Sequence, residues 1–283
     1  MLWADDGCPR SPRFGDVYRS RFGAWQQAGT VFLGGCGLPQ RWQTRHQHTL
    51  LETGFGLGLN FLRTAVGWAA DAQRCPQLHY HAIEAYPVPA HDLLRSAQAV
   101  APELPAPTRA ALDLWADALA RAWATLRPGL NRWIWRLHDL GQPQATPCAR
   151  PAAALDSARP EADEGAALTL HLSLWLDTVQ AALPRLRHAG LRADSVYLDG
   201  FGPTVNPDMW SEATLAGVHA CCAPGAHLAT YTVAAAVRQR LAQLGFEVLR
   251  RPGLPPKRHR LQARLGATES AETPSNIEHQ NGL

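Results

Sequence analysis

Residues 49–62 read TLLETGFGLGLNFL, an apolar strand followed by three closely spaced glycines and an apolar stretch suited to open a helix. Gly54, Gly56 and Gly58 stand at alternate positions, so backbone N–H groups in this turn can approach a ligand without interference from Cβ atoms. The amino end of the following helix adds positive partial charge. The segment predicts a nucleotide-like cofactor; the alternative is a turn that only packs a helix on a sheet.

The acidic residues around this turn favour S-adenosylmethionine over a dinucleotide. The dinucleotide fingerprint is G-x-G-x-x-G with an acidic residue about 20 positions later. Here Glu52 precedes the glycines, where it would repel a pyrophosphate but offer a counter-charge to a cationic amino or sulfonium group. Glu84 ends the next strand, in the segment LHYHAIEAY, and is expected to accept both ribose hydroxyls. The expected cofactor is therefore S-adenosylmethionine.

Strand and helix signals alternate along the chain. Strands are predicted at 49–51, 78–83, 195–198 and 227–231, and helices at 59–70, 90–99, 108–122, 176–187, 209–222 and 234–244. This alternation predicts an α/β, Rossmann-like fold with a parallel or mostly parallel sheet and helices on both faces. Two further extended segments, 132–140 and 168–176, are expected to pair as an added β-hairpin.

Length and local composition indicate how the chain is divided. Its 283 residues are enough for one large α/β domain, expected at 49–266, with residues 1–48 as an N-terminal extension packed on it. Residues 141–167 are rich in Pro and Ala and predict a mobile insertion. The polar residues 267–283 predict a disordered tail.

Charge and cysteine content restrict the class of protein. The formal net charge of +3 neither requires nor excludes a nucleic acid partner. The 6 cysteines show no C-x-x-C spacing and the 12 histidines no H-x-x-H spacing, so we expect reduced thiols and no metal. No stretch approaches the roughly 18 apolar residues of a membrane span, and the pattern of a signal peptide is missing. These features predict a cytoplasmic protein without a membrane partner.

The segment SVYLDGFGPTVNPDMW, residues 195–210, supplies a candidate catalytic group. An apolar strand delivers Asp199 at its carboxyl end, where ligands bind in open α/β sheets. A carboxylate there can orient a neutral amine and take up its proton, which matters because an alkylamine with a pKa near 10.4 is mostly protonated at neutral pH. Phe201 offers a face on which a base can stack. Alternatively, Asp199 only caps a turn and Phe201 fills the core.

Several segments together resemble the methyltransferase domain of the bacterial bifunctional tRNA 5-methylaminomethyl-2-thiouridine biosynthesis proteins. The resemblance runs from about Trp3 to Arg264. Its segments are WADDGCPRSPRFGDVYRS, VFLGGCGLPQRW, LETGFGLGLNFL, AIEAYP, LWLD, YLDGFGPTVNPDMW, GAHLATYT, VRQRLAQLGFEV and PPKRHR. The resemblance implies methyl transfer from S-adenosylmethionine to the aminomethyl nitrogen of 5-aminomethyl-2-thiouridine at the tRNA wobble position, which gives 5-methylaminomethyl-2-thiouridine.

The resemblance also implies roles for particular residues. Asp199 matches the active-site carboxylate, Glu84 the ribose-binding acid and Asp177 an acid near the adenine. The expected cofactor-binding set is Glu52, Gly54, Phe55, Gly56, Gly58, Asn60, Glu84 and Asp177. The expected substrate-binding set is Tyr18, Arg41, Phe201, Pro203, Lys257 and Arg258.

The chain departs from the family pattern at two positions and in extent. Leu57 stands where the family usually has Thr, and Cys36 where it usually has Asn, which predicts fewer hydrogen bonds to cofactor or substrate. No segment after about Ala267 resembles the FAD-dependent domain of the bifunctional members. We therefore expect a stand-alone or truncated methyltransferase without FAD, with a separate FAD-dependent oxidase acting upstream.

The resemblance implies the anticodon loop of tRNA as a partner, and basic residues crowd the last part of the expected domain. They are Arg238, Arg240, Arg250, Arg251, Lys257, Arg258, His259 and Arg260. Such a cluster can bind phosphates even when the net charge is small, although it is also typical of a solvated helix face. Two other functions stay open: a methyltransferase of the same fold acting on a small-molecule or protein amine, and a non-catalytic nucleotide- or RNA-binding module.

Overall fold

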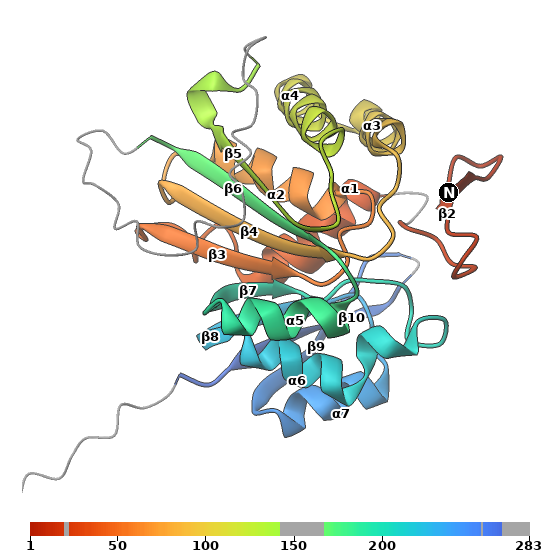
Figure 1. Ribbon diagram of the computed structural model, residues 1–283, viewed down its shortest axis with the longest axis vertical. Helices are drawn as coiled ribbons and strands as arrows, with labels where there is room; N and C mark the ends of the chain where they lie inside the picture. Colours follow the sequence, from red (N-terminus) through yellow and green to blue (C-terminus); the bar gives the residue numbers. More distant parts are fainter. Residues whose placement is uncertain (20–22, 142–166, 256, 268–283) are drawn as a thin grey trace, which may run out of the picture.

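The computed structural model describes residues 1–19, 23–141, 167–255 and 257–267, and these build an eight-stranded sheet (Figure 1). The strand order is β5-β6-β4-β3-β7-β8-β10-β9. Their bounds are β5 (Gly129–Arg136), β6 (Thr169–Leu176), β4 (Gln77–Glu84), β3 (Gln47–Glu52), β7 (Ala193–Tyr197), β8 (Cys222–Thr230), β10 (His259–Leu265) and β9 (Phe246–Pro252). The central strands from β6 to β8 pair in parallel, and β5, β10 and β9 pair antiparallel. The predicted mostly parallel sheet is confirmed.

Helices cover both faces of this sheet (Figure 1). One face carries α1 (Ala24–Gln27), α2 (Leu59–Ala70), α3 (Ala90–Val100) and α4 (Ala106–Trp123); the other carries α5 (Val179–His188), α6 (Glu212–Ala220) and α7 (Ala235–Gln243). Short helical turns are η1 (Ala28–Leu33), η2 (Gly34–Cys36), η3 (Ala101–Glu103), η4 (Leu137–Asp139) and η5 (Pro207–Trp210). Among the described residues, no helix has the length and apolar character that a membrane crossing requires.

The last residues of β3 are apolar on both sides because each side faces a helical layer. Leu50 packs into the core with α2 and α4, whereas its neighbour Leu51 packs into the core with α5 and α6. Side chains of a strand alternate between the two faces of a sheet, so a strand buried on both faces is a continuous apolar run. This explains why TLLE gives a clear strand signal without a polar alternation.

The predicted elements are present in the structure, with differences at their ends. The extended segment expected at 132–140 is β5, which ends at Arg136 and is followed by η4, and the strand expected at 227–231 begins earlier, at Cys222. The helix expected at 176–187 begins later, at Val179, because Thr178 is its N-cap and its hydroxyl accepts a hydrogen bond from the Ala181 N–H. The helix expected at 209–222 is divided into η5 and α6, because Ser211 caps α6 in the same way.

The expected β-hairpin is confirmed, and a second one was missed. β5 and β6 pair antiparallel from Gly129↔Leu176 to Arg136↔Thr169. The β9–β10 hairpin at the far edge of the sheet was not predicted, because its sequences FEVLRRP and HRLQARL are rich in arginine. The insertion expected at 141–167 and the tail expected at 267–283 fall almost entirely outside the described residues.

The N-terminal region forms a two-stranded sheet of β1 (Leu2–Trp3) and β2 (Pro9–Arg10) and is fixed to α3. The Trp3 indole N–H donates to Asp92 Oδ1 at 2.7 Å, and Arg19 Nε donates to Ser96 Oγ at 3.2 Å. These contacts bring the first residues to the same end of the sheet as the carboxyl ends of the parallel strands.

Candidate active site

A cavity of about 370 Å³ opens at the carboxyl ends of β3, β4, β6 and β7. After β3 the chain continues to β4 on one side, and β7 lies on the other side of β3, so the strand order reverses here. Ligands bind at such a reversal in open α/β sheets. Phe14, residues 16–19 and Lys257 also line the cavity.

The glycine turn forms one wall. Gly54, Phe55 and Gly56 line the cavity. A Cβ atom on Gly54 would lie 2.8 Å from the Asp199 carbonyl oxygen, so only glycine allows the two strand-end loops to approach this closely. Gly58 lies behind the wall with a φ of +70°, as the N-cap of α2, and a Cβ there would lie 2.9 Å from the Phe55 ring.

Glu84 ends β4 and joins this turn through its carboxylate. Its Oε2 accepts a hydrogen bond of 2.7 Å from the Gly56 N–H, and its Oε1 accepts one of 2.7 Å from the Tyr86 N–H. Burial raises the pKa of Glu84, and these backbone donors oppose the shift by stabilising the charged form. Each carboxylate oxygen can accept a further hydrogen bond, so Glu84 can still bind a pair of hydroxyls.

Asp199 reaches the cavity from the end of β7. Its Oδ2 accepts a hydrogen bond of 2.8 Å from Asn60 Nδ2, and its Oδ1 accepts one of 2.8 Å from the Gly200 N–H. The Thr53 hydroxyl donates to its backbone oxygen at 2.7 Å. Burial raises the pKa of Asp199 from 3.8 to about 6, which leaves the group ionised at neutral pH but much more basic than an exposed aspartate.

The position of Glu52 corrects an expectation. Its side chain is fully buried and, among the described residues, it is not part of the cavity wall. Its two oxygens accept hydrogen bonds of 2.8 Å from Asn60 Nδ2 and the Tyr80 hydroxyl. Burial, followed by the charge of Asp199, raises the pKa of Glu52 well above its ordinary value. Glu52 therefore cannot contact the cofactor as a counter-charge; it holds Asn60, which lines the cavity.

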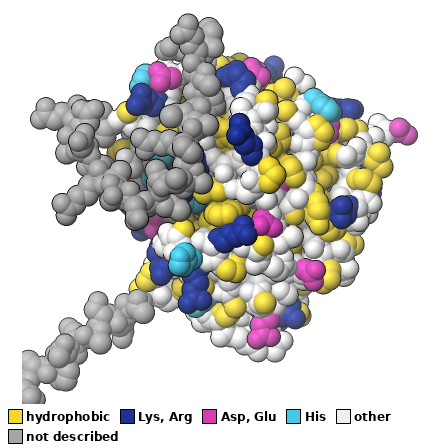
Figure 2. Space-filling view, viewed as in Figure 1, with side chains coloured by type: hydrophobic (Ala, Val, Ile, Leu, Met, Phe, Trp, Pro, Cys, Tyr) yellow, Lys and Arg dark blue, Asp and Glu magenta, His cyan; other side chains and the backbone are white. Residues whose placement is uncertain are grey.

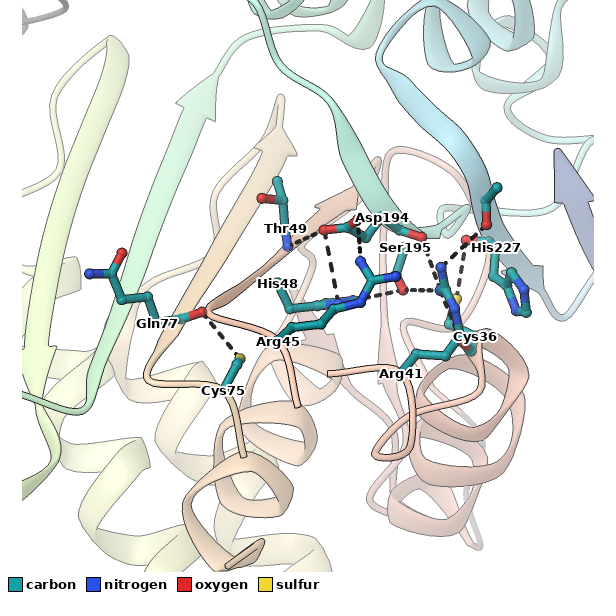
Figure 3. Close-up of polar contacts among 11 residues, drawn as sticks. Cys36, Arg41, Arg45, His48, Thr49, Cys75, Gln77, Asp194, Ser195 and His227 are labelled. Carbon is teal, nitrogen blue, oxygen red and sulfur yellow. Dashed lines mark hydrogen bonds and ion pairs between the residues drawn. The ribbon is translucent and has the colours of Figure 1, made fainter. Parts of the chain in front are cut away.

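Arg41 and Cys36 lie at the opposite end of the sheet, which corrects two more expectations (Figure 3). Arg41 Nη1 donates to the Asp194 carbonyl at 3.0 Å and to Ser195 Oγ at 3.1 Å, at the start of β7. The Cys36 thiol is fully buried and contacts the Val196 carbonyl at 3.4 Å. Neither residue lines the cavity. Arg41 is therefore not placed to bind substrate, and the replacement of Asn by Cys36 removes no hydrogen bond from the cavity. Leu57, by contrast, does line the cavity.

Aromatic rings gather over the DGF turn. Phe201 stacks on Phe14 with ring centroids 4.6 Å apart, and Tyr18 meets Phe201 edge-on at 5.0 Å. Asp16 Oδ2 accepts a hydrogen bond of 3.2 Å from the Gly202 N–H, which fixes the N-terminal segment to the turn. Pro203 is not part of the cavity wall within the described residues. Phe14 and Asp16 were not predicted as site residues, although they belong to the segment RFGDVY that carries the family resemblance.

The other predicted residues divide between the wall and the surface. Lys257 lines the cavity, and its Nζ lies 3.5 Å from the centroid of the Tyr231 ring, a cation–π contact. Asp177 lines the cavity after β6, and its Oδ2 accepts a hydrogen bond of 3.3 Å from Arg185. Arg258 is exposed and is not part of the wall. Tyr231, which was not predicted, also lines the cavity, and its hydroxyl donates to the Gly200 carbonyl at 2.5 Å.

The wall fits an adenosine-bearing cationic cofactor better than it fits a metal or a polyphosphate. Of the residues that the structure describes, five acidic ones line the wall, Asp16, Glu84, Asp177, Asp199 and Asp208, against two basic ones, Arg19 and Lys257. Within the described part of the chain, no group of three or more His, Cys, Asp or Glu residues is arranged to hold a metal ion. A wall with several carboxylates would repel phosphates.

Comparison with known proteins agrees with this geometry. Residues 157–266 match the family model described as S-adenosyl-L-methionine-dependent methyltransferase. The chain is 44% identical over 261 residues to the tRNA 5-methylaminomethyl-2-thiouridine biosynthesis bifunctional protein MnmC of Acidovorax sp. (strain JS42), covering 92% of this chain and 34% of that protein. The MnmC of Polaromonas naphthalenivorans (strain CJ2) is 42% identical over 264 residues, with coverage of 92% and 35%.

Among solved structures, the crystal structure of MNMC2 from Aquifex aeolicus superposes with a TM-score of 0.59 at 19% identity, covering 90% of this chain and 65% of that one. The chain spans about a third of the length of the curated relatives it matches. The chain therefore has the Rossmann-like fold of S-adenosyl-L-methionine-dependent methyltransferases and is related, over that third, to the MnmC bifunctional proteins.

Proposed function

We propose that the chain methylates the aminomethyl nitrogen of 5-aminomethyl-2-thiouridine at the wobble position of tRNA. The observation that carries the proposal is the position of Asp199: its carboxylate lies in the same cavity as the glycine turn and Glu84. Similarity to MnmC supports the choice of tRNA as the substrate. A tRNA substrate also supports a cytoplasmic location.

The cofactor would be held by the glycine turn, by Glu84 at its ribose and by Asp177 beside its adenine. When bound, S-adenosylmethionine supplies a methyl group on a positively charged sulfur. The close approach of Gly54 to the Asp199 backbone brings the cofactor wall and the carboxylate together, so both reactants share one small space. Holding them in a reactive orientation lowers the barrier by several kcal/mol, up to roughly 7–11 in well-oriented systems.

Asp199 would act on the amine. Its carboxylate accepts a hydrogen bond from the neutral –NH₂ and directs the nitrogen lone pair toward the methyl carbon. After the new N–CH₃ bond forms, the nitrogen is a secondary ammonium, and Asp199 takes one of its protons. A pKa of about 6 suits this task, because the group is ionised at pH 7 and still binds a proton readily.

Lys257 would keep the amine unprotonated. Its ammonium faces the same cavity and feels the charges of Asp199 and Asp16. A second ammonium close by is disfavoured by repulsion, so a substrate amine that enters the cavity loses its proton more easily than in water. Phe201, with Phe14 and Tyr18 around it, offers an aromatic surface for the base of the wobble nucleotide.

The division of the chain remains part of the proposal. Residues 1–48 would form an extension packed on a methyltransferase domain at 49–266, with an insertion at 141–167 and a tail at 267–283. The amine substrate would come from an FAD-dependent oxidase, because removal of a carboxymethyl group from nitrogen is an oxidation that the cavity residues do not perform.

The test is to incubate Asp199→Asn and the unchanged chain with S-adenosylmethionine and tRNA that carries 5-aminomethyl-2-thiouridine. Mass spectrometry of the nucleosides reads the product. The unchanged chain should give 5-methylaminomethyl-2-thiouridine, and Asp199→Asn should lose at least about a hundredfold in rate, the size of a typical general-base contribution. Asp113→Asn, on the exposed face of α4, is the matched control. Methylation of a small amine or protein in tRNA-free extract, and none on tRNA, would refute the choice of substrate.

A further inference from the structure

The β9–β10 hairpin places a cluster of arginines beside the cavity. β10 runs antiparallel to β8, with Leu261 opposite Thr230, so the start of β10 lies at the same end of the sheet as the active site. Arg251 and Arg260 are direct cross-strand partners at this end of the hairpin. The turn between the two strands carries Lys257 into the cavity wall and Arg258 to the surface.

The opposed pair of Arg251 and Arg260 is unfavourable for folding. Like charges directly opposite each other on two antiparallel strands destabilise the pairing. The pKa of Arg260 is lowered, first by burial and then by the charge of Arg251. The hairpin therefore holds two guanidinium groups together against their repulsion.

Uncharged groups are the observed partners of both guanidinium groups within the described chain. Arg251 Nε donates to Gln262 Oε1 at 3.3 Å. Arg260 Nε donates to the Pro252 carbonyl at 3.1 Å, and its Nη1 donates to the Val31 carbonyl at 3.4 Å. Farther from the cavity the pattern changes, because Glu247 lies opposite Arg264 on the same two strands. In the strand register, residues of opposite charge therefore face each other at the far end of the hairpin, and residues of like charge face each other at the end near the active site.

The surroundings of the pair connect it to the active site. Arg260 contacts the backbone of η1, and Ala28 and Phe32 of the same turn line the cavity. Figure 2 shows Lys and Arg side chains scattered among acidic and hydrophobic ones over the visible face, without one broad positive field. On this face, an attraction for polyanions would have to come from a local cluster.

We propose that Arg251 and Arg260, with Arg258 beside them, bind the phosphodiester backbone of the RNA whose wobble nucleotide enters the cavity. This inference rests on the proposed function for the identity of the RNA. Phosphate oxygens would relieve the repulsion of the paired guanidinium groups, which bind phosphates in a bidentate manner. The backbone contact positions the RNA, and the cavity selects the nucleotide.

The test is Arg251→Glu in the full chain, because it predicts opposite effects on folding and on binding. The new carboxylate would lie opposite Arg260, so Tm should stay the same or rise by about 1–3 °C. Affinity for an unmodified tRNA transcript, measured at several salt concentrations, should fall roughly tenfold or more, and the slope of log K against log salt should decrease by about 1 to 2. A loss of affinity through misfolding would lower Tm instead.

The control is Arg187→Glu, an exposed arginine in the last turn of α5. It should keep the affinity and the salt slope of the unchanged chain. Wild-type affinity and salt slope in Arg251→Glu, or an equal loss in Arg187→Glu, would overturn the inference. Binding of the transcript is measured without methyl transfer, so the two hypotheses can fail separately. If binding depends on Arg251 but the chain forms no product on modified tRNA, the inference stands and the proposed function is refuted.

Discussion

Three carboxyl groups in and behind the cavity wall, those of Asp199, Glu84 and Glu52, differ in what surrounds them. Asp199 and Glu84 face the cavity and accept backbone hydrogen bonds, which favour the charged form. Glu52 is fully buried. Burial, followed by the charge of Asp199, raises its pKa well above the ordinary value of a glutamate. Asn60 donates to both Glu52 and Asp199, so one amide links the buried acid to the acid that faces the cavity.

The raised pKa of Asp199 predicts a pH dependence of methyl transfer. In the proposed function the carboxylate is the active form, so kcat should rise with pH through about 6 and level off near neutrality. A stability effect of opposite sign accompanies it. The folded state binds a proton more tightly than the unfolded state between pH 3.8 and about 6, so ionised Asp199 destabilises the fold above this range.

The measurement compares Tm of Asp199→Asn and the unchanged chain from pH 5 to pH 8. As pH rises, the Tm of Asp199→Asn should increase relative to that of the unchanged chain, whatever the difference between the two Tm values at pH 5. A difference that stays constant across this range would show that Asp199 titrates as an ordinary exposed acid.

Glu84 carries the second prediction at this scale. Glu84→Ala should weaken S-adenosylmethionine binding by about 10- to 100-fold, the loss expected for one or two hydrogen bonds to a charged group. Calorimetric titration gives the Kd, and Glu212→Gln, exposed in the first turn of α6, is the control. An unchanged Kd in Glu84→Ala would exclude the ribose role.

At the scale of elements, the turn between β3 and α2 needs glycine at position 58 both for its backbone conformation and for lack of space. Gly190 provides a comparison, because only its backbone conformation requires glycine. Gly58 has a φ of +70° and also lacks room for a Cβ, which would meet Phe55 at 2.9 Å and Leu119 at 3.1 Å. Gly190, after α5, has a φ of +76° but open space around it. Alanine at either position suffers backbone strain of about 1 kcal/mol or more, but only Gly58→Ala also crowds its neighbours.

We therefore expect Gly58→Ala to lower the free energy of unfolding by about 2–4 kcal/mol and Gly190→Ala by about 1. Urea denaturation of both variants provides the comparison. Gly58→Ala should also weaken cofactor binding, because Phe55, which it displaces, lines the cavity. Equal losses of stability would mean that the Phe55 ring moves aside without cost.

Elements with a regular apolar pattern could be predicted from the sequence, and elements defined by charge could not. The carboxyl ends of β3, β4 and β7 consist of buried apolar residues that lead to Glu52, Glu84 and Asp199, and this pattern carries the strand signal. β9 and β10 form the edge of the sheet, where one face tolerates arginine, and the strand signal is lost. Glu84 and Asp199, which follow such apolar strand ends, line the cavity for the same reason.

At the scale of the whole molecule, long-range placement was the part that local patterns did not contain. Phe14 and Asp16 reach the cavity because the first residues are fixed to α3, which no periodicity indicates. Arg41 was expected in the cavity, yet it lies at the amino end of β7. The segments that carry the family resemblance include all three of these residues, but the resemblance does not indicate at which end of the sheet each segment lies.

The network around Arg41 gives the last prediction, which concerns acid stability (Figure 3). His48 is fully buried, and its Nε2 lies 3.0 Å from Ser195 Oγ. Burial lowers the pKa of His48 from 6.5 to about 4, although Asp194 opposes the shift. The unfolded chain therefore binds a proton at His48 more readily than the folded chain between these values. Stability from this group is present above pH 6.5 and is lost as pH falls toward 4.

His48→Gln should remove that loss while keeping a hydrogen-bonding group near Ser195. At pH 7 the variant is expected to be less stable than the unchanged chain, because it gives up the packing of the imidazole against Trp42. Between pH 6.5 and 4.5 the difference should shrink by up to about 1.4 kcal/mol per pH unit, read from urea denaturation at each pH. Because His48 lies at the end of the sheet opposite the cavity, cofactor affinity at pH 7 should stay unchanged, and a fall in that affinity would reveal coupling between the two ends of β7.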